Sequence, residues 1–133
     1  MLLFLETFGE TIRVRAIQTL SFVLRPSLDW LEPLYQRISF PMSSILEKQL
    51  VLTVGGAIRR FIHSNPDKFL SVQPMINGLL KVMKSTGLVT DKIVLVRALG
   101  NTASDYIVND IVPILESFDE PRLQIAAISA LDK

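Results

Sequence analysis

The chain has 133 residues, the size of one ordinary domain, and is long enough to bury a hydrophobic core. Its net charge of +1 comes from 14 basic and 13 acidic residues that are interspersed, which gives no electrostatic footprint for nucleic acid. The absence of cysteine excludes a disulfide framework and thiol chemistry, and it argues against a zinc site. The hydrophobic content of 49% is high for a soluble domain and indicates either a membrane segment or apolar surface that packs on something outside the chain.

Charged residues decide between these two alternatives. They interrupt every apolar run, whereas a spanning helix needs about 20 consecutive apolar residues. The opening "MLLFLETFGETIRVR" lacks a basic segment before its apolar residues, and its apolar run is shorter than the roughly 7–15 residues of a signal peptide. Glu6 and Glu10 also argue against a mitochondrial presequence. We therefore expect no membrane span and no leader sequence.

Apolar residues recur at three- and four-residue spacing through most of the chain, which predicts helices. The first is expected over residues 10–25 and ends at Pro26, because proline lacks an amide hydrogen and clashes with the preceding turn. Ser27 is predicted to cap a second helix over residues 28–38 with its side chain. Pro33 within that segment indicates a late start or a kink.

The third helix is expected to begin near residues 41–43 and to be long and strongly apolar. The segment "HSNPD" (63–67) terminates it. A shorter helix follows over residues 72–84, with Pro74 tolerated in its first turn, and "STG" (85–87) ends it.

Thr90 or Asp91 is predicted to cap the next helix, which continues through Leu99. Gly100 and Asn101 are then expected to supply the left-handed backbone that ends this helix in a tight turn. The short segment "GNTAS" would thus form the turn of an antiparallel helix pair. A strand is the weaker alternative for "KIVLVRAL", since the turn and the helical spacing of the apolar residues favour a helix.

Ser104 or Thr102 is predicted to start a helix that ends at Ser117. Asp119 is expected to cap the final helix, with Pro121 in its first turn. The pattern thus predicts about seven helices and an all-α fold, an α-α superhelix of antiparallel helix pairs similar to HEAT repeats.

Internal similarity supports a repeat architecture. Four segments share a charged or polar opening and a branched apolar centre, and most end in small residues: "TIRVRAIQTL" (11–20), "EKQLVLTVGG" (47–56), "DKIVLVRALG" (91–100) and "RLQIAAISAL" (122–131). Their ends at residues 20, 56, 100 and 131 leave intervals that each fit one helix pair. Neither "MLLFL" nor "AISALDK" resembles the polar cap that a free solenoid needs. We therefore expect residues 1–133 to form a single solenoid segment without terminal caps, either part of a longer array or docked against other domains.

The segment "VRALGNTASDYIVNDIVPILES", followed by "PRLQIAAISAL", resembles the helical domain of the large lipid transfer proteins. This family includes vitellogenins, apolipoprotein B, insect apolipophorins and the large subunit of microsomal triglyceride transfer protein. The segments "RALGNTA" (97–103) and "RLQIAAISAL" match its recurring pattern, and "LVLTVGGAIRRFIHSNP" (50–66) resembles an upstream helix of the family. Secreted members commonly carry cysteines near residues 61–67, and this sequence has none. Generic HEAT repeats also produce a pattern of this kind.

The resemblance implies a curved double layer of helices that wraps a lipid cavity built mostly from β-sheets outside this chain. The helical layer would then be scaffold and docking surface in a lipid transport protein, with lipid bound through the parent protein and other domains or a protein partner packed on the helices. It also implies the endoplasmic reticulum lumen or secretion. The alternative is a HEAT- or armadillo-like scaffold that binds proteins in the cytoplasm and has no lipid role.

The candidate site residues are structural or apolar. The expected repeat-turn and structural positions are Gly100, Asn101, Pro113 and Arg122. Aromatic residues that could form an apolar docking surface, with core packing as the alternative, are Trp30, Phe61, Phe69 and Tyr106.

No constellation for chemistry is evident, so we expect no enzyme, no cofactor and no metal site. His63 is the only histidine and has no ligand set around it. The pair Gly55-Gly56 lacks the lysine of a phosphate loop and is interpreted as a close-packing site. Arg59-Arg60 could receive an acidic partner, although solvation is the simpler interpretation. Asp105, Asn109 and Asp110 lie along a predicted helix and cannot wrap around a calcium ion.

Overall fold

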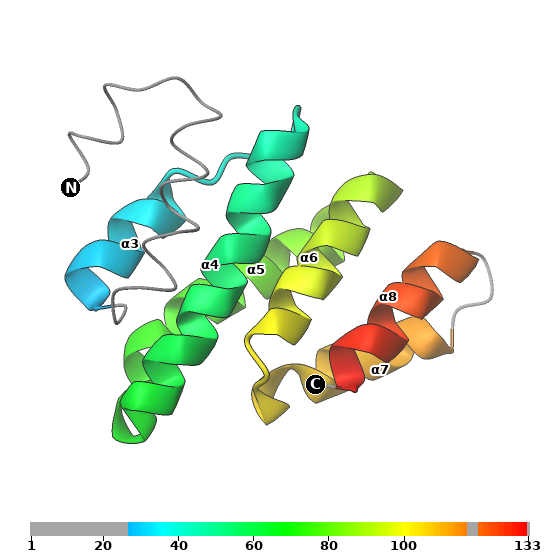
Figure 1. The fold of residues 1–133 in the computed structure, drawn as a ribbon. Helices are drawn as coiled ribbons and strands as arrows, with labels where there is room; N and C mark the ends of the chain where they lie inside the picture. Colours follow the sequence, from blue (N-terminus) through cyan, green and yellow to red (C-terminus); the bar gives the residue numbers. More distant parts are fainter. Residues whose placement is uncertain (1–26, 117–119, 133) are drawn as a thin grey trace.

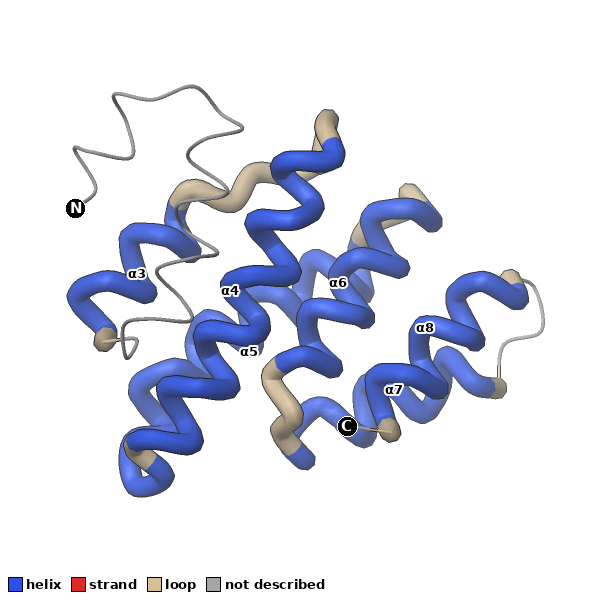
Figure 2. The backbone as a smooth tube through the Cα atoms, viewed as in Figure 1, coloured by secondary structure: helices blue, strands red, loops and turns tan. Residues whose placement is uncertain are grey.

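The computed structural model describes residues 27–116 and 120–132. These residues form six α-helices and two short 3-10 helices, and none of them lies in a strand (Figure 2). The all-α prediction is therefore confirmed, and the helix expected over residues 10–25 lies outside the described part. The helices are α3 (Leu28–Gln36), α4 (Ile45–Ser64), α5 (Phe69–Ser85), α6 (Val89–Asn101), α7 (Val108–Leu115) and α8 (Pro121–Leu131), with η1 (Pro66–Lys68) before α5 and η2 (Asp105–Ile107) before α7.

The helices form two layers (Figure 1). The front layer consists of α4, α6 and α8, which run in the same direction, and α6 packs between the other two. The back layer consists of α3, α5 and α7, which run in the opposite direction. Each back helix packs against the front helix that follows it, so the successive pairs are α3–α4, α5–α6 and α7–α8. This is the arrangement of an α-α superhelix.

The internal similarity of the sequence maps onto the front layer. The segments 47–56, 91–100 and 122–131 lie in α4, α6 and α8 respectively. Their branched residues supply fully buried core side chains, such as Val54 and Leu95. The repeat is therefore one front helix together with its back helix, and neighbouring repeats bury each other's apolar faces.

The "GNTAS" turn has a different place from the one expected. It joins α6 to α7, which belong to two successive pairs, and does not form the turn within one pair. Gly100 and Asn101 are both helical, and the left-handed residue is Ala103, with φ of 50°. The expectation that Gly100-Asn101 turns the chain is therefore wrong. Gly100 is required for another reason, because a Cβ atom there would lie 2.6 Å from the Cα atom of Ala130 in α8.

Several predicted helix starts also differ from those observed. Ser27 is the N-cap of α3, but its carbonyl oxygen accepts the terminal amides and its side chain makes no cap bond. α4 begins at Ile45, where the Ser44 hydroxyl accepts from the amide of Glu47 at 3.1 Å. α5 begins before the expected residue 72, so Pro74 lies beyond its first turn.

The later helix boundaries also agree with the predictions only in part. Leu88, and neither Thr90 nor Asp91, occupies the N-cap of α6. The predicted stops at "HSNPD" and at "STG" are confirmed, as is Pro121 in the first turn of α8. Ser104 caps the 3-10 helix η2, whereas α7 itself begins at Val108 with Ile107 at its N-cap. The proposed cap Asp119 lies outside the described residues.

Candidate functional site: helix junctions, an edge groove and an open end face

Small residues bring the front helices together. A Cβ atom on Gly55 of α4 would collide with the carbonyl oxygen of Ala98 in α6, just as one on Gly100 would collide with Ala130 in α8. Gly56 has open space around its Cα atom, so only the first glycine of the predicted pair is a contact. Asn101, predicted as a turn residue, instead donates from Nδ2 to the carbonyl oxygen of Leu52 in α4 at 3.4 Å. Gly100 and Asn101 therefore act at junctions between repeats.

The other two predicted structural positions are at the surface. Pro113 lies inside α7, and its exposed ring borders a groove between helix pairs. Arg122 lies in the first turn of α8, where its Nε donates to Glu120 Oε1 at 3.1 Å. This hydrogen bond lowers the pKa of the Glu120 carboxyl. Pro113 thus lies in the last turn of α7, and Arg122 lies in the first turn of α8.

The four aromatic residues do not share one exposed face. Phe61 is buried in α4 among core residues, so it does not belong to an exposed docking surface. Phe69 and Tyr106 contact each other edge to face, with ring centroids 5.5 Å apart. The Tyr106 hydroxyl also donates to Asn77 Oδ1 at 2.6 Å, which joins η2 to α5. Trp30 is half-buried on α3, packed against the core.

A buried carboxylate ties the first two helix pairs together. Asp91 is in the first turn of α6 and is almost fully buried, and its Oδ2 accepts from the backbone N–H of Met42 at 3.1 Å. Met42 belongs to the connection between α3 and α4 and is itself buried. Sequence reasoning assigned Asp91 only to a cap. The available signal was a carboxylate within an otherwise apolar helix, which must be bonded if it is buried.

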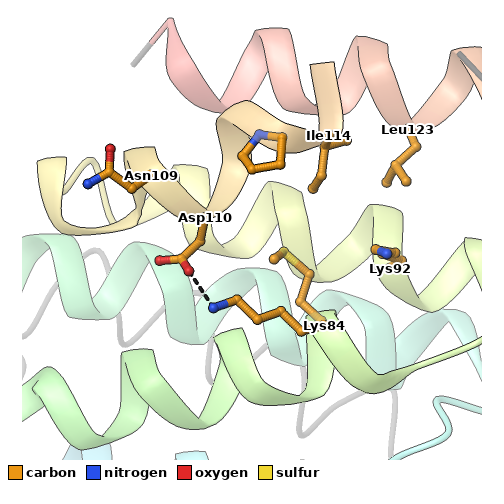
Figure 3. Close-up of a pocket in the computed structure, with 8 residues that line it drawn as sticks. Lys84, Lys92, Asn109, Asp110, Ile114 and Leu123 are labelled. Carbon is orange, nitrogen blue, oxygen red and sulfur yellow. Dashed lines mark ion pairs between the residues drawn. The ribbon is translucent and has the colours of Figure 1, made fainter. Parts of the chain in front are cut away.

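An open groove of about 430 Å³ lies between the second and third helix pairs. Ile114 of α7 and Leu123 of α8 extend toward the α5–α6 pair, as Figure 3 shows. The ammonium group of Lys84 meets the carboxylate of Asp110 at 2.5 Å on one side, and Lys92 lies on the other (Figure 3). The groove therefore combines an apolar wall with lysine side chains.

The other polar residues considered for chemistry lie outside this groove. His63 is exposed in the last turn of α4, and Asp105 is exposed in η2. Arg59 is exposed, while Arg60 is half-buried and burial lowers the pKa of its guanidinium group. Within residues 27–116 and 120–132, no three acidic, histidine or cysteine side chains gather in a way that could hold a metal ion. In the same residues, no helix is long and apolar enough to cross a membrane.

The outer face of α8 is apolar and exposed. Val51 and Val96 each lie four residues before a glycine that contacts the next front helix, and they are 1% and 0% exposed. Ala98 and Ala130 are the residues that face the glycine of the preceding front helix. Val96 and Ile128 each precede one of these alanines by two residues, so Ile128 is the equivalent of Val96. Yet Ile128 is 59% exposed, and Ile125, one turn earlier, is 64% exposed. The position that a neighbouring helix covers in α4 and α6 is therefore uncovered in α8.

Paired helices in two layers, joined by small-residue contacts, define the class of protein as an α-α superhelix. The family model described as the vitellogenin TPR domain matches residues 8–133, nearly the whole chain. The chain therefore belongs to this family, the helical vitellogenin-type domain of the large lipid transfer proteins. Neither the curated proteins nor the solved structures yielded a significant match.

Proposed function

We propose that this chain is a non-catalytic helical layer of a lipid transport protein, which supports and docks other protein segments around a lipid cavity formed elsewhere. Membership of the vitellogenin TPR domain family supports the link to lipid transport. The observation that carries the docking role is the outer face of α8, where Ile128 is exposed at a position that is buried in α4 and α6, and Ile125 is exposed one turn earlier.

The character of this face favours protein over lipid as its occupant. In α4 and α6 the equivalent valines pack against a neighbouring helix that approaches closely through small residues. Two exposed isoleucines on one helix give a narrow apolar stripe of the kind that a helix or sheet covers. A lipid cavity requires a larger concave apolar surface, which in our proposal is supplied by other segments of the parent protein.

Photo-crosslinking tests this proposal. Benzoylphenylalanine is placed at position 128 of the full natural protein, and the crosslinked products are identified by mass spectrometry. We expect crosslinks to a protein segment of the same polypeptide, outside residues 1–133. A matched probe at position 49, an exposed site on α4, should give few such crosslinks.

The other outcomes separate the alternatives. Crosslinks mainly to lipid would refute the assignment of lipid contact to other segments. Crosslinks mainly to a different protein, from a preparation that carries no lipid, would favour a HEAT-like interaction scaffold without a lipid role. Native mass spectrometry of the same preparation measures its lipid content.

A further inference from the structure

The repeat creates two comparable grooves at one edge of the molecule. At this edge the back helices end and the front helices begin. The first groove lies between the α3–α4 and α5–α6 pairs, and the second lies between the α5–α6 and α7–α8 pairs. Tyr35, the penultimate residue of α3, contacts Gly78 of α5 across the first groove. Lys84, the penultimate residue of α5, contacts Asp110 of α7 across the second.

The chain fills the first groove with its own backbone. The connection from α3 to α4 covers residues 37–44 and is long enough to fold over the groove. Its Met42 is only 6% exposed and belongs to the core, and Phe40 packs beside the same core. The third residue of α6, Asp91, holds the Met42 amide. A bent peptide segment whose buried Met42 side chain is unbranched and apolar therefore occupies this groove.

The second groove has no such occupant among the described residues. The connection from α5 to α6 covers only residues 86–88, and its Leu88 points outward and is 51% exposed. Asp91, the third residue of α6, lies at the first groove. The third residue of α8 is Leu123, which takes the equivalent place and lines the second groove. The open volume of about 430 Å³ falls within the range of pockets that bind ligands. The short connection thus leaves a binding groove.

The charges in the second groove favour an acidic occupant. Lys84 is neutralised by Asp110, which is half-buried. Lys92 lines the groove and forms no ion pair with any other described residue. A carboxylate placed next to the apolar side chain of a ligand would reach this ammonium group, and partial burial would strengthen the attraction.

We propose that the second groove binds a short segment of a partner protein, which inserts one unbranched apolar side chain against Met83, Ile114 and Leu123 and places an adjacent carboxylate at Lys92. A peptide is favoured over a small molecule because the comparable groove in the same chain already holds a peptide. The groove and the outer face of α8 are separate observations, so this proposal does not depend on the lipid role.

The probe is a fluorescent peptide with the sequence of residues 38–44 in which Ser43→Asp and Ser44→Asp supply the acidic group. Its binding to the full chain is followed by fluorescence anisotropy, and the ¹³C-labelled methyl group of Met83 reports occupancy by NMR. One control peptide carries lysine at both serine positions. The other is the acidic peptide with the additional substitution Met42→Asp. We expect saturable binding of the acidic peptide at least about tenfold tighter than that of either control.

Variants of the chain locate the site. Lys92→Glu should weaken binding of the acidic peptide by about tenfold or more, and Ile114→Trp should abolish it by filling the groove. Lys81→Glu makes the same charge change at an exposed position of α5 outside the groove, and it should leave binding unchanged. Circular dichroism confirms that each variant is folded, and Lys92→Glu alone suffices if the tryptophan variant does not fold.

Three results would overturn the proposal. One is the absence of saturable binding by the acidic peptide. Another is equal binding of the acidic and lysine peptides, or binding that Lys92→Glu does not weaken. The third is oleate shifting the Met83 methyl signal while the peptide leaves it unchanged, which would make the groove a site for a fatty acid.

Discussion

The backbone N–H of Met42 and the carboxylate of Asp91 are 49 residues apart in sequence and form a hydrogen bond of 3.1 Å inside the protein. The bond fixes the connection between α3 and α4 on the first turn of α6. A negative charge is favourable at this place because the free amides of a helix start carry partial positive charge. One side chain thus joins two successive helix pairs.

Replacing Asp91 should therefore weaken the fold. In Asp91→Ala the buried Met42 amide loses its acceptor, and we expect the free energy of unfolding to fall by about 1–3 kcal/mol. Urea denaturation followed by circular dichroism measures the loss. The control Asp67→Ala changes an exposed carboxylate in η1 and should shift stability by less than about 0.5 kcal/mol. Equal effects of the two variants would contradict a structural role for the Asp91 hydrogen bond.

The front-layer junctions predict a contrast between adjacent glycines. Gly55→Ala drives a methyl group into the Ala98 carbonyl and should destabilise the protein by about 1–3 kcal/mol. Gly56→Ala meets nothing within 4 Å and should stabilise α4 by up to about 1 kcal/mol, because alanine favours the helix. Thermal unfolding of the two variants under the same conditions makes the comparison. Stabilisation by both substitutions would show that α4 and α6 lie farther apart than described.

Burial raises the pKa of the Tyr35 hydroxyl above its usual value. In the Tyr106→Phe variant Tyr35 is the only tyrosine, so the ultraviolet absorbance of tyrosinate should report a midpoint above about 10. The folded state binds this proton more tightly than the unfolded state, so stability is complete below the unfolded pKa. It should fall as the pH rises from there through the folded pKa. Tyr35→Phe should remove this contribution to the alkaline slope, and a midpoint at or below 10 would contradict burial of the hydroxyl.

The start of α4 predicts a change at acidic pH. The Glu47 carboxylate accepts hydrogen bonds from the Ser43 amide at 2.5 Å and the Ser43 hydroxyl at 2.9 Å, and these lower its pKa. Because the folded state favours the ionised form, this contribution is present above the unfolded pKa and is lost as the pH falls through the folded pKa. NMR titration should show a Glu47 pKa below its usual value. Ser43→Ala should raise that pKa toward the usual value, and an unchanged titration would disprove the hydroxyl contact.

The periodicity of apolar residues was sufficient to predict the helices and their assembly into antiparallel pairs. Proline and glycine positions marked the ends of α4 and α5 and the start of α8, since these residues act through local backbone geometry. The family was also recognisable from the "RALGNTA" and "RLQIAAISAL" segments, and the match over residues 8–133 confirms it. Local sequence signals were therefore sufficient to predict the fold class.

Features that depend on distant neighbours could not be predicted in this way. Gly100 was assigned to a left-handed turn because glycine near a helix end is common there. Its actual constraint is Ala130, a residue of another helix. Asp91 was assigned to a cap for a similar reason, although its partner is Met42. The groove at Lys92 arises from the unequal lengths of two connections, and neither connection reveals this alone.

The left-handed backbone of Ala103 has a consequence for local motion. An alanine in this conformation stores roughly 1–2 kcal/mol, and it does so at the joint that precedes the α7–α8 pair. In a stack where each pair packs mainly on its neighbours, a strained joint between two pairs lets one pair open without the other. Amide hydrogens of α7 and α8 should accordingly exchange with solvent sooner than those of α4.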